Sequence, residues 1–408
     1  MTIEGLLGGV RVGDLHPVRV MGVINLSQES FYSRSFVRPK DAVERVMHLV
    51  EEGADLIDVG AVSTAPGSPP ISEKEERTRL IPALKSILGA ADVEISVDTQ
   101  RAGVAEEALS LGASCVNDVL GLGDPRMAGT VAEHGGSLVI MASRNRPGDL
   151  LGMTEIITVL GERMRSAVKV GVSEERIILD PGVGRWVPEK RPEHDLAILD
   201  GLGRLRALNR PVMAAVSRKS FIGERLNRPD PEARLSGSLA AAVIAVYNGS
   251  HVVRTHDVSA SLDHIRMAEA IRGRPPLVRR GDVKAEVCAE VGHPGDLGQI
   301  MKRIGVGEGG SKAMSGKGAF RAVHLRGVGS MEAVIIKQEM LARGGDAAIP
   351  MGALRCDPGR MEVLVLGTAA QIKGLIKNLK GQPFNLPAVG EAIGMAMEQI
   401  EDPKRYGW

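Results

Sequence analysis

Short apolar segments rich in β-branched residues recur along the first two thirds of the chain. Eight such segments are predicted as strands, at residues 18–24, 56–61, 93–98, 114–119, 137–142, 176–182, 211–217 and 251–257. Segments of helical character lie between them, such as residues 41–54, 102–113 and 237–249, which end on glycine or Gly-Ala. This alternation predicts parallel strands with right-handed crossovers. Eight units over about 250 residues favour an α/β fold of the (β/α)₈ TIM barrel type, with a doubly wound sheet as the alternative.

The pattern changes where the predicted barrel, residues 1–272, ends. Residues 273–282 are rich in proline, glycine and arginine and are predicted to be a linker. Residues 283–408 are predicted as a small α+β domain. Its expected helices and strands lie near residues 294–304, 319–326, 330–345, 361–367 and 368–381. The total length of 408 residues exceeds that of an ordinary barrel by roughly a hundred residues and supports two domains.

Two segments of the second domain bear on its role. The glycine-rich segment 305–318 contains Ser-Gly-Lys-Gly, but it lacks the GxxxxGK[ST] pattern of a phosphate-binding loop and is predicted to be a mobile loop. The helix at 330–343 has mostly apolar residues near helical spacing, which predict a packing face rather than a cofactor site. They are Met331, Val334, Ile335, Gln338 and Leu341. The role of this accessory domain stays open.

Composition favours a small-molecule ligand. The chain carries 51 basic and 50 acidic residues, a net charge of +1, so no overall field attracts nucleic acid or an anionic membrane. Aromatic residues make up only 2%, too few for the stacking surfaces that single-stranded nucleic acid needs. No apolar run approaches the roughly 18 residues of a membrane span, and the N-terminus has no targeting pattern. A cytoplasmic protein that binds neither nucleic acid nor membrane is therefore expected.

The three cysteines favour the same compartment. Cys115, Cys288 and Cys356 are odd in number and share no metal-ligand or redox spacing. This argues for a reducing environment and against a disulfide framework. We interpret them as buried or incidental thiols.

Polar residues follow most of the predicted strands at their C-terminal ends. They are Asn25, Asp58, Asp98, Asn117, Asp118, Asp180, Ser217, Arg218, Lys219, Arg254, His256 and Asp257. Taken singly, each is more often a helix cap or a loop hydrogen-bonding group. The C-terminal ends of parallel barrel strands, however, meet at one mouth, where barrel enzymes carry their chemistry. Because seven strands repeat the pattern, the set predicts an active site at this mouth.

Seven motifs stand in order at the predicted strand ends. They are VMGVINLSQESF (20–31), ADLIDVGAVSTAPG (54–67), ISVDT (95–99), VNDV (116–119), DPGVG (180–184), VSRKSFIG (216–223) and VVRTHDV (252–258). Together they resemble the motifs of dihydropteroate synthases, in a long, archaeal-like form with a C-terminal accessory domain. Methyltetrahydrofolate-dependent methyltransferases share the Asp and Asn positions but not the combination of SRKS with RTHD.

The resemblance implies a reaction and a set of site residues. Dihydropteroate synthases displace diphosphate from dihydropterin-6-ylmethyl diphosphate with an aryl amine, and Mg²⁺ assists its departure. Asp98, Asn117 and Asp180 match pterin-binding positions, where carboxylate and amide oxygens accept hydrogen bonds from the pterin edge. Lys219 matches the lysine that contacts the pterin carbonyl and borders the amine site, and Ser220 matches the serine of the amine pocket. Lys219, Asp98 and Asp180 are the expected catalytic residues.

The expected diphosphate side of the site is cationic. Arg254 and His256 supply a guanidinium fork and an imidazole at one strand end. Asn25 matches the residue near Mg²⁺ and diphosphate, and one such oxygen together with substrate phosphates suits a magnesium shell. Thr64 is expected to serve the pterin, and Met141 to line the substrate site. Family members are commonly homodimers, so the resemblance also implies a homodimer.

Departures from the family pattern cluster at two loops and near the amine site. Ala65 replaces the arginine expected in the second loop, and the first loop lacks the usual proline and glycine pair. The usual Met-His is Met141-Ala142 here, and residues 184–188 replace the usual Gly-Phe-Gly-Lys. The last two changes fall near the expected amine site.

These departures leave the acceptor open. It is either 4-aminobenzoate, for folate biosynthesis, or a ribosylated aminobenzene phosphate, for methanopterin biosynthesis. The phosphate of the second amine would suit one of four arginines: Arg34, Arg144, Arg146 or Arg185. Two further hypotheses are a non-catalytic pterin-binding paralogue and a pterin-dependent methyltransferase. Retention of the pterin, lysine and Arg-His groups favours catalysis.

Overall fold

The computed structural model divides the chain into two compact units, residues 1–288 and residues 289–408. The structure describes residues 2–27, 36–62, 69–274, 278–281, 283–287, 292–400 and 402–406. Each unit has its own hydrophobic core, as independent domains do. None of the described helices is both long enough and apolar enough to cross a lipid bilayer.

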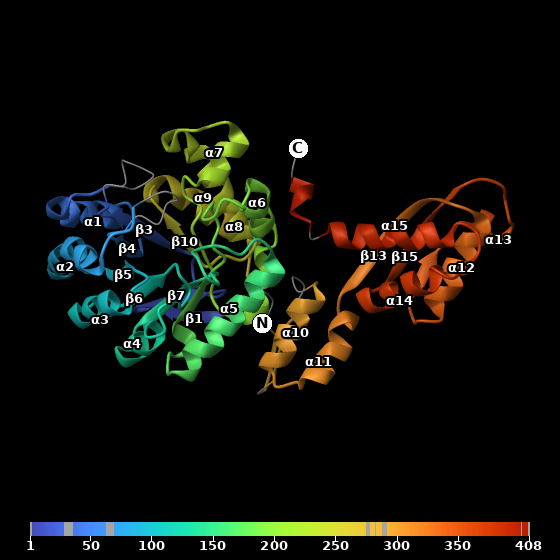
Figure 1. Ribbon diagram of the computed structural model, residues 1–408, viewed down its shortest axis with the longest axis horizontal. Helices are drawn as coiled ribbons and strands as arrows, with labels where there is room; N and C mark the ends of the chain where they lie inside the picture. Colours follow the sequence, from blue (N-terminus) through green and yellow to red (C-terminus); the bar gives the residue numbers. More distant parts are fainter. Residues whose placement is uncertain are drawn as a thin grey trace. The chain divides into compact units, whose positions relative to one another are not determined.

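The first unit contains eight parallel strands that close into a barrel (Figure 1). Each strand pairs with the next in the order β8-β7-β6-β5-β4-β3-β10-β9, and a parallel bridge from Leu179 to Val212 joins the two ends of the sheet. The strands are β3 (Arg19–Asn25), β4 (Leu56–Gly60), β5 (Glu94–Asp98), β6 (Cys115–Asp118), β7 (Ser137–Met141), β8 (Ile177–Asp180), β9 (Met213–Ala214) and β10 (Val252–Thr255). All eight predicted strands are present, and the predicted barrel is confirmed.

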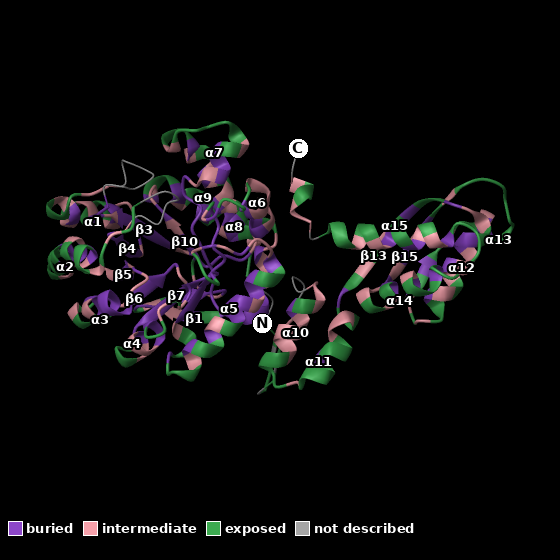
Figure 2. Ribbon diagram, viewed as in Figure 1, coloured by how far each residue is buried: buried purple, intermediate pink, exposed green. Residues whose placement is uncertain are grey.

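Helices follow the strands and cover the outside of the barrel (Figure 1). They are α1 (Ala42–Glu51), α2 (Glu73–Ala90), α3 (Ala102–Leu111), α4 (Met127–Glu133), α5 (Met153–Lys169), α6 (Pro192–Asp200), α7 (Ser220–Leu226), α8 (Leu235–Tyr247) and α9 (Val258–Arg272). Gly112 ends α3 with a φ of 115°, in the left-handed region that glycine adopts readily. The enclosed strands are largely buried (Figure 2), as parallel strands covered on both faces are.

A β-hairpin that the sequence pattern did not predict closes the N-terminal mouth of the barrel. Its strands, β1 (Glu4–Leu7) and β2 (Val10–Gly13), pair antiparallel. Leu7 and Val12 are fully buried in a cluster with residues from the barrel strands, among them Met21 of β3. The opposite, C-terminal mouth is the end at which barrel enzymes carry their chemistry.

A second short hairpin follows the barrel. It consists of β11 (Val278–Arg280) and β12 (Val283–Ala285). Glu286 then accepts a hydrogen bond from the Thr2 hydroxyl at 3.0 Å, which ties this segment to the start of the chain. The division between the two units thus falls after the hairpin rather than within the predicted linker, residues 273–282.

The second unit is an α+β domain with one antiparallel sheet, in the strand order β13-β15-β14. Its elements are α10 (Pro294–Arg303), α11 (Glu308–Met314), β13 (Phe320–Val328), α12 (Ser330–Leu341), β14 (Asp346–Ala348), α13 (Met351–Leu354), β15 (Met361–Thr368), α14 (Ala369–Leu379) and α15 (Leu386–Gln399). Val363 and Val365 of β15 pack in one core with Ile336 of α12 and Leu375 of α14. This agrees with the predicted α+β class.

Two details of the second unit differ from the prediction. The glycine-rich segment predicted to be a loop contains the helix α11. In α12, Met331, Gln338 and Leu341 were predicted to pack but are exposed, whereas Ala333, Ile336 and Met340 are buried. The packing-face prediction was wrong for these three residues because the apolar residues of α12 are distributed around the whole helix, so spacing alone does not define its buried face.

A buried polar network stands beside the N-terminal hairpin. The Asp14 carboxylate accepts two hydrogen bonds from Arg206, at 2.8 and 2.9 Å, and one from the Ile3 N–H at 2.7 Å. His251 Nε2 lies 3.3 Å from the same carboxylate, and its Nδ1 accepts from the Val212 N–H, so the neutral imidazole carries its proton on Nε2. Burial alone raises the pKa of Asp14, but the hydrogen bonds from His251 and Arg206 outweigh it and hold this pKa well below its usual range.

Replacing Asp14 by Asn should lower the free energy of unfolding by about 3 kcal/mol at pH 7, because it leaves the buried Arg206 without its counter-ion. The pKa of Asp14 is lower in the folded than in the unfolded protein. Its contribution is therefore complete above about pH 4 and is lost progressively as the pH falls below that value. Urea unfolding at neutral and acidic pH measures the difference, with exposed Asp263→Asn as the control. Equal stability of Asp14→Asn and the wild type at pH 7 would contradict this prediction.

Candidate active site

A cavity of about 460 Å³ opens at the C-terminal mouth of the barrel. Its walls include every predicted site residue that the structure describes: Asn25, Asp98, Asn117, Met141, Asp180, Lys219, Ser220, Arg254 and His256. Thr64 lies outside the described residues. The parallel topology brings these distant residues together because each lies at or after the C-terminal end of one of seven barrel strands, β3 and β5 to β10. Their roles toward a substrate remain predictions.

An arginine that lines this cavity lies between two carboxylates. Arg254, on β10, donates from Nε to Asp58 at 2.6 Å and from Nη2 to Asp98 at 2.9 Å. The Asn117 amide donates to the same Asp58 carboxylate at 3.0 Å. Asp58 is fully buried, and these two donors supply the counter-charge and the hydrogen bonds of its Oδ2 atom. Asp58 was seen as a strand-end residue but was not predicted as part of the site.

Buried acceptor atoms at this end of the barrel lack donors among the described residues. They include Asn117 Oδ1 and Asp58 Oδ1. Asp180 is oriented by the N–H of Gly182, which donates to its Oδ1 at 2.7 Å. Buried polar atoms are nearly always hydrogen-bonded, so the Asn117 oxygen calls for a donor from a ligand or a bound water.

Burial changes the proton affinity of the ionisable groups in the cavity. It raises the pKa of Asp98 to about 7, against the lowering effect of Arg254, and it also raises the pKa of Asp180. Burial lowers the pKa of Lys219 to about 8, and the neighbouring Arg254 adds to the effect. Perturbed carboxyl and amine groups that share one cavity are typical of an active site.

The imidazole of His256 is fixed by a neighbouring hydroxyl. Its Nδ1 lies 3.0 Å from the Ser217 hydroxyl, which also accepts from the His256 backbone N–H at 3.3 Å. Burial lowers the pKa of His256 to about 3, and the nearby Arg254 and Lys219 lower it further. The ring is therefore neutral at pH 7, and an anion bound beside it would favour its protonation.

Lys219 and Trp186 form one wall of the cavity. The Lys219 ammonium lies 4.7 Å from the centre of the Trp186 ring, a cation–π distance. The indole rests on Gly148, where a Cβ atom would lie 2.1 Å from its Cδ1. Beside it, Arg185 pairs with Glu224 at 3.4 Å. Trp186 was not predicted as a site residue, although its place in a segment that departs from the family pattern was a signal.

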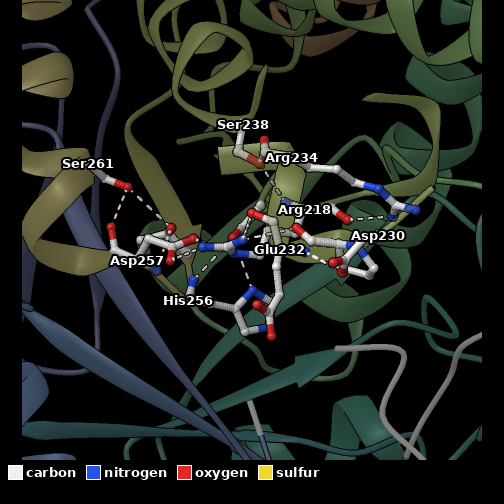
Figure 3. A network of polar contacts seen from close by, with 11 residues as sticks. Arg218, Asp230, Glu232, Arg234, Ser238, His256, Asp257 and Ser261 are labelled. Carbon is white, nitrogen blue, oxygen red and sulfur yellow. Dashed lines mark hydrogen bonds and ion pairs between the residues drawn. The ribbon is translucent and has the colours of Figure 1, made fainter. Parts of the chain in front are cut away.

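A buried arginine holds the segment that carries Lys219 (Figure 3). The Arg218 guanidinium donates to the Asp257 carboxylate at 2.8 and 2.6 Å and to the carbonyl oxygens of Pro231 and Glu232, both at 2.9 Å. The φ of Arg218 is 55°, which a residue with a side chain adopts only when its surroundings impose it. The ion pair thus fixes the segment after β9 to the end of β10.

A second buried arginine completes this network (Figure 3). Arg234 donates to the carbonyl oxygen of Arg218 at 3.0 Å and to that of Arg228 at 2.9 Å. The Ser238 hydroxyl accepts from the Arg218 N–H at 2.8 Å and donates to the Arg234 carbonyl at 2.9 Å. These hydrogen bonds attach the loop between α7 and α8 to the segment that bears Lys219.

Asn25 can hold one ligand position of a magnesium ion. It lines the cavity at the end of β3, and its Oδ1 accepts from the Ser27 N–H at 3.0 Å. A carbonyl oxygen has two lone pairs, so it can bind a further partner. In the part of the chain that the structure describes, no group of three or more His, Cys, Asp or Glu side chains could hold a metal. An ion at Asn25 would take most of its ligands from substrate oxygens and water, as Mg²⁺ commonly does.

The barrel and its acceptor-rich cavity define a class of enzyme. The sequence profile of the family described as "Pterin binding enzyme" matches residues 21–256. This range runs from β3 to the end of β10 and includes every cavity residue predicted from the sequence. Fold, cavity and sequence therefore agree on a pterin-binding barrel enzyme.

Within that class, the chain belongs to the dihydropteroate synthase family. It is 39% identical to the dihydropteroate synthase of Bacillus subtilis (strain 168) over 258 residues, which cover 62% of this chain and 88% of that relative. The structure of Xanthomonas albilineans dihydropteroate synthase with 4-aminobenzoic acid is similar, with a TM-score of 0.60 and 33% identity over 67% of this chain and 100% of the other. A Coxiella burnetii dihydropteroate synthase in complex with pteroic acid has a TM-score of 0.59 and 36% identity over 66% of this chain and 99% of the other. The C-terminal α+β unit is additional to this family region.

Replacing Arg218 by Lys should lower the free energy of unfolding by roughly 2 kcal/mol. Lysine cannot make the paired bonds to Asp257 and reach the two loop carbonyls at the same time. Urea unfolding measures the change, and Arg228→Lys, an exposed arginine in the same loop, is the control. A loss no greater than that of the control would show that Arg218 does not hold the segment.

Proposed function

We propose that this protein condenses dihydropterin-6-ylmethyl diphosphate with 4-aminobenzoate and releases diphosphate, a step of folate biosynthesis. One observation carries the proposal: buried and half-buried oxygen acceptors share a single cavity with two cations and an imidazole. These groups are Asp98, Asn117, Asp180, Lys219, Arg254 and His256. The membership of the chain in the dihydropteroate synthase family supports the same reaction.

The acceptor side of the cavity suits a pterin. A pterin edge bears an amine and ring N–H groups, which match the unpaired Oδ1 of Asn117 and the carboxylate of Asp180. Lys219 can donate to the pterin carbonyl, since its ammonium lies in the same cavity. Binding would satisfy polar atoms that the described residues leave without partners.

The cationic side of the cavity suits a diphosphate. Arg254 lines the cavity, and the neutral imidazole of His256 can donate one N–H and take up a proton beside an anion. The Asn25 oxygen would hold Mg²⁺ together with phosphate oxygens. Bound there, the ion would supply charge neutralisation for the leaving group.

In the proposed reaction, the amine nitrogen attacks the methylene carbon between the pterin and the diphosphate. The C–N bond forms as the C–O bond to diphosphate breaks, and the amine loses one proton. Positive charge develops on the methylene and the pterin ring as the diphosphate departs, and the ionised forms of Asp98 and Asp180 can stabilise it. Exclusion of water by the cavity walls limits hydrolysis as a competing reaction.

The ion pairs around the cavity favour 4-aminobenzoate over the phosphate-bearing amine. Three of the arginines considered for a phosphate are described, and each has a glutamate partner: Arg144 with Glu155, Arg146 with Glu189 and Arg185 with Glu224. Arg34 lies outside the described residues. Neither Arg144 nor Arg146 lines the cavity, and the Glu224 carboxylate lines it together with Arg185. The Trp186 ring beside Lys219 offers an aromatic face to a small aryl amine.

The direct test is diphosphate release by the purified protein with the pterin diphosphate, Mg²⁺ and each of the two amines in turn. We expect release with 4-aminobenzoate. Lys219→Ala should reduce kcat/KM by about a hundredfold or more, because it removes the cation from the cavity. The control is Lys85→Ala, an exposed lysine on α2, which should keep wild-type activity.

The outcomes separate the candidate functions. Pterin binding without diphosphate release with either amine would refute the proposed transferase and favour a non-catalytic pterin-binding protein. Release with the ribosylated amine alone would overturn the assigned acceptor and place the reaction in methanopterin biosynthesis.

The kcat/KM for the pterin substrate should follow a bell-shaped pH profile. Asp98, with a pKa of about 7, must lose its proton to accept from the pterin, so activity should rise as the pH passes that value. Lys219, with a pKa of about 8, must keep its proton, so activity should fall above that value. Initial rates from about pH 5 to pH 10 measure both limbs. A flat wild-type profile across this range would rule out these two groups as the controlling ones.

A further inference from the structure

Lys190 is among the largest fully buried side chains of the protein. Its side chain is 0% exposed, although lysine is one of the residue types most rarely buried. It lies in the loop between β8 and α6, and it does not line the cavity. A buried ammonium is costly unless it is paired, so its surroundings should explain its presence.

Lys190 and Asp195 hold the turn that follows β8. The Lys190 Nζ donates to the Gly182 carbonyl oxygen at 2.5 Å and lies 3.4 Å from Asp195 Oδ1. The same Asp195 oxygen accepts from the Gly184 N–H at 2.8 Å. The turn from Gly182 to Gly184 is therefore hydrogen-bonded both at a carbonyl and at an N–H to one buried ion pair.

This turn contacts two groups of the cavity. The Gly182 N–H donates to Asp180 Oδ1 at 2.7 Å and so orients that carboxylate. A Cβ atom at Gly184, whose φ is 120°, would lie 3.1 Å from Lys219 Cδ, so the turn packs directly on the Lys219 side chain. A shift of the turn would move both groups.

We propose that Lys190 and Asp195 are positioning residues, which fix Asp180 and Lys219 for pterin binding and set the charge around Lys219. The inference rests on the proposed transferase function and deepens it. An ion pair with a purely packing role could be replaced by apolar residues at little cost in stability. In a positioning and electrostatic role, by contrast, the charges of Lys190 and Asp195 are needed to hold the turn and to act on Lys219.

The electrostatic part concerns the cation of Lys219. Burial and Arg254 lower its pKa, the carboxylates of Asp180 and Asp195 raise it, and Lys190 lowers it. Loss of the Lys190 charge should therefore raise the pKa of Lys219, and loss of the Asp195 charge should lower it. The charged and titratable groups that face Lys219 come from β5, β8, β10, the loop after β8 and α6. They are Asp98, Asp180, Arg254, His256, Lys190 and Asp195.

The experiment compares Lys190→Met, Asp195→Asn and the double variant in the full chain. We expect the alkaline limb of kcat/KM for the pterin diphosphate to move up by about 0.5 to 1 pH unit in Lys190→Met, because a neighbouring positive charge is removed. It should move down in Asp195→Asn and lie near the wild-type position in the double variant. The KM for the pterin substrate should rise roughly tenfold in Lys190→Met, since the turn loses a charge-assisted hydrogen bond.

Controls separate positioning from general damage. Lys85→Met, an exposed lysine, should leave the limb and the KM unchanged. Asp195→Asn keeps the size of the side chain and an oxygen for the Gly184 N–H, so it tests the charge even if Lys190→Met fails to fold. Two results would overturn the inference. One is a shift of the alkaline limb in the same direction in both single variants. The other is an unchanged alkaline limb together with a KM for the pterin substrate within twofold of the wild-type value.

A binding measurement keeps the two proposals distinct. If the wild type binds the pterin diphosphate but releases no diphosphate, the proposed function fails while the positioning role can still be tested. Calorimetric titration with the pterin diphosphate across the same pH range should then show the opposite shifts in its affinity. Identical pH dependence of binding in all three variants would refute the positioning role independently of turnover.

Discussion

The guanidinium of Arg254 is the contact on which the cavity depends. It joins the end of β10 to Asp58 on β4 and Asp98 on β5, and Asn117 on β6 hydrogen-bonds to the same Asp58. Without a cation between them, these two carboxylates would repel each other, and at least one would stay protonated. The arginine therefore ties several strand ends into one fixed set of acceptors, which is arranged before a ligand binds.

Much of this arrangement can be predicted from the sequence, because a barrel converts a linear pattern into positions in space. Each apolar segment predicts a strand, and the residue after it is placed at the C-terminal mouth by the topology alone. Asp98, Asn117 and Asp180 line one cavity for this reason, although no sequence pattern specifies their contacts. The pairing of Arg254 with Asp58 was not predicted, since strand order indicates proximity but not which side chains meet.

What the sequence could not predict depends on contacts between segments far apart along the chain. The N-terminal hairpin of β1 and β2 has strands of four residues each, too short to give a pattern distinct from a loop until Leu7 meets the barrel interior. Trp186 and Lys190 lie in irregular loop, where periodicity gives no orientation, and a lysine is ordinarily expected to be exposed. The apolar residues of α12 are distributed around the whole helix, so only the packed structure shows that Ile336 is buried.

The two sides of the cavity are built from different kinds of structure, and this explains where the family departures cluster. The oxygen acceptors of the cavity stand on strand ends that the barrel fixes, whereas Trp186 lies in the loop after β8 and Ser220 begins α7. A loop can change in length and composition at little cost to the core. The side of the cavity built from loops can therefore vary while the acceptors on the strand ends are retained. The buried pair of Lys190 and Asp195 then has a physical reason to exist, because it anchors the variable loop to the fixed end of β8 and prevents changes in that loop from displacing Asp180.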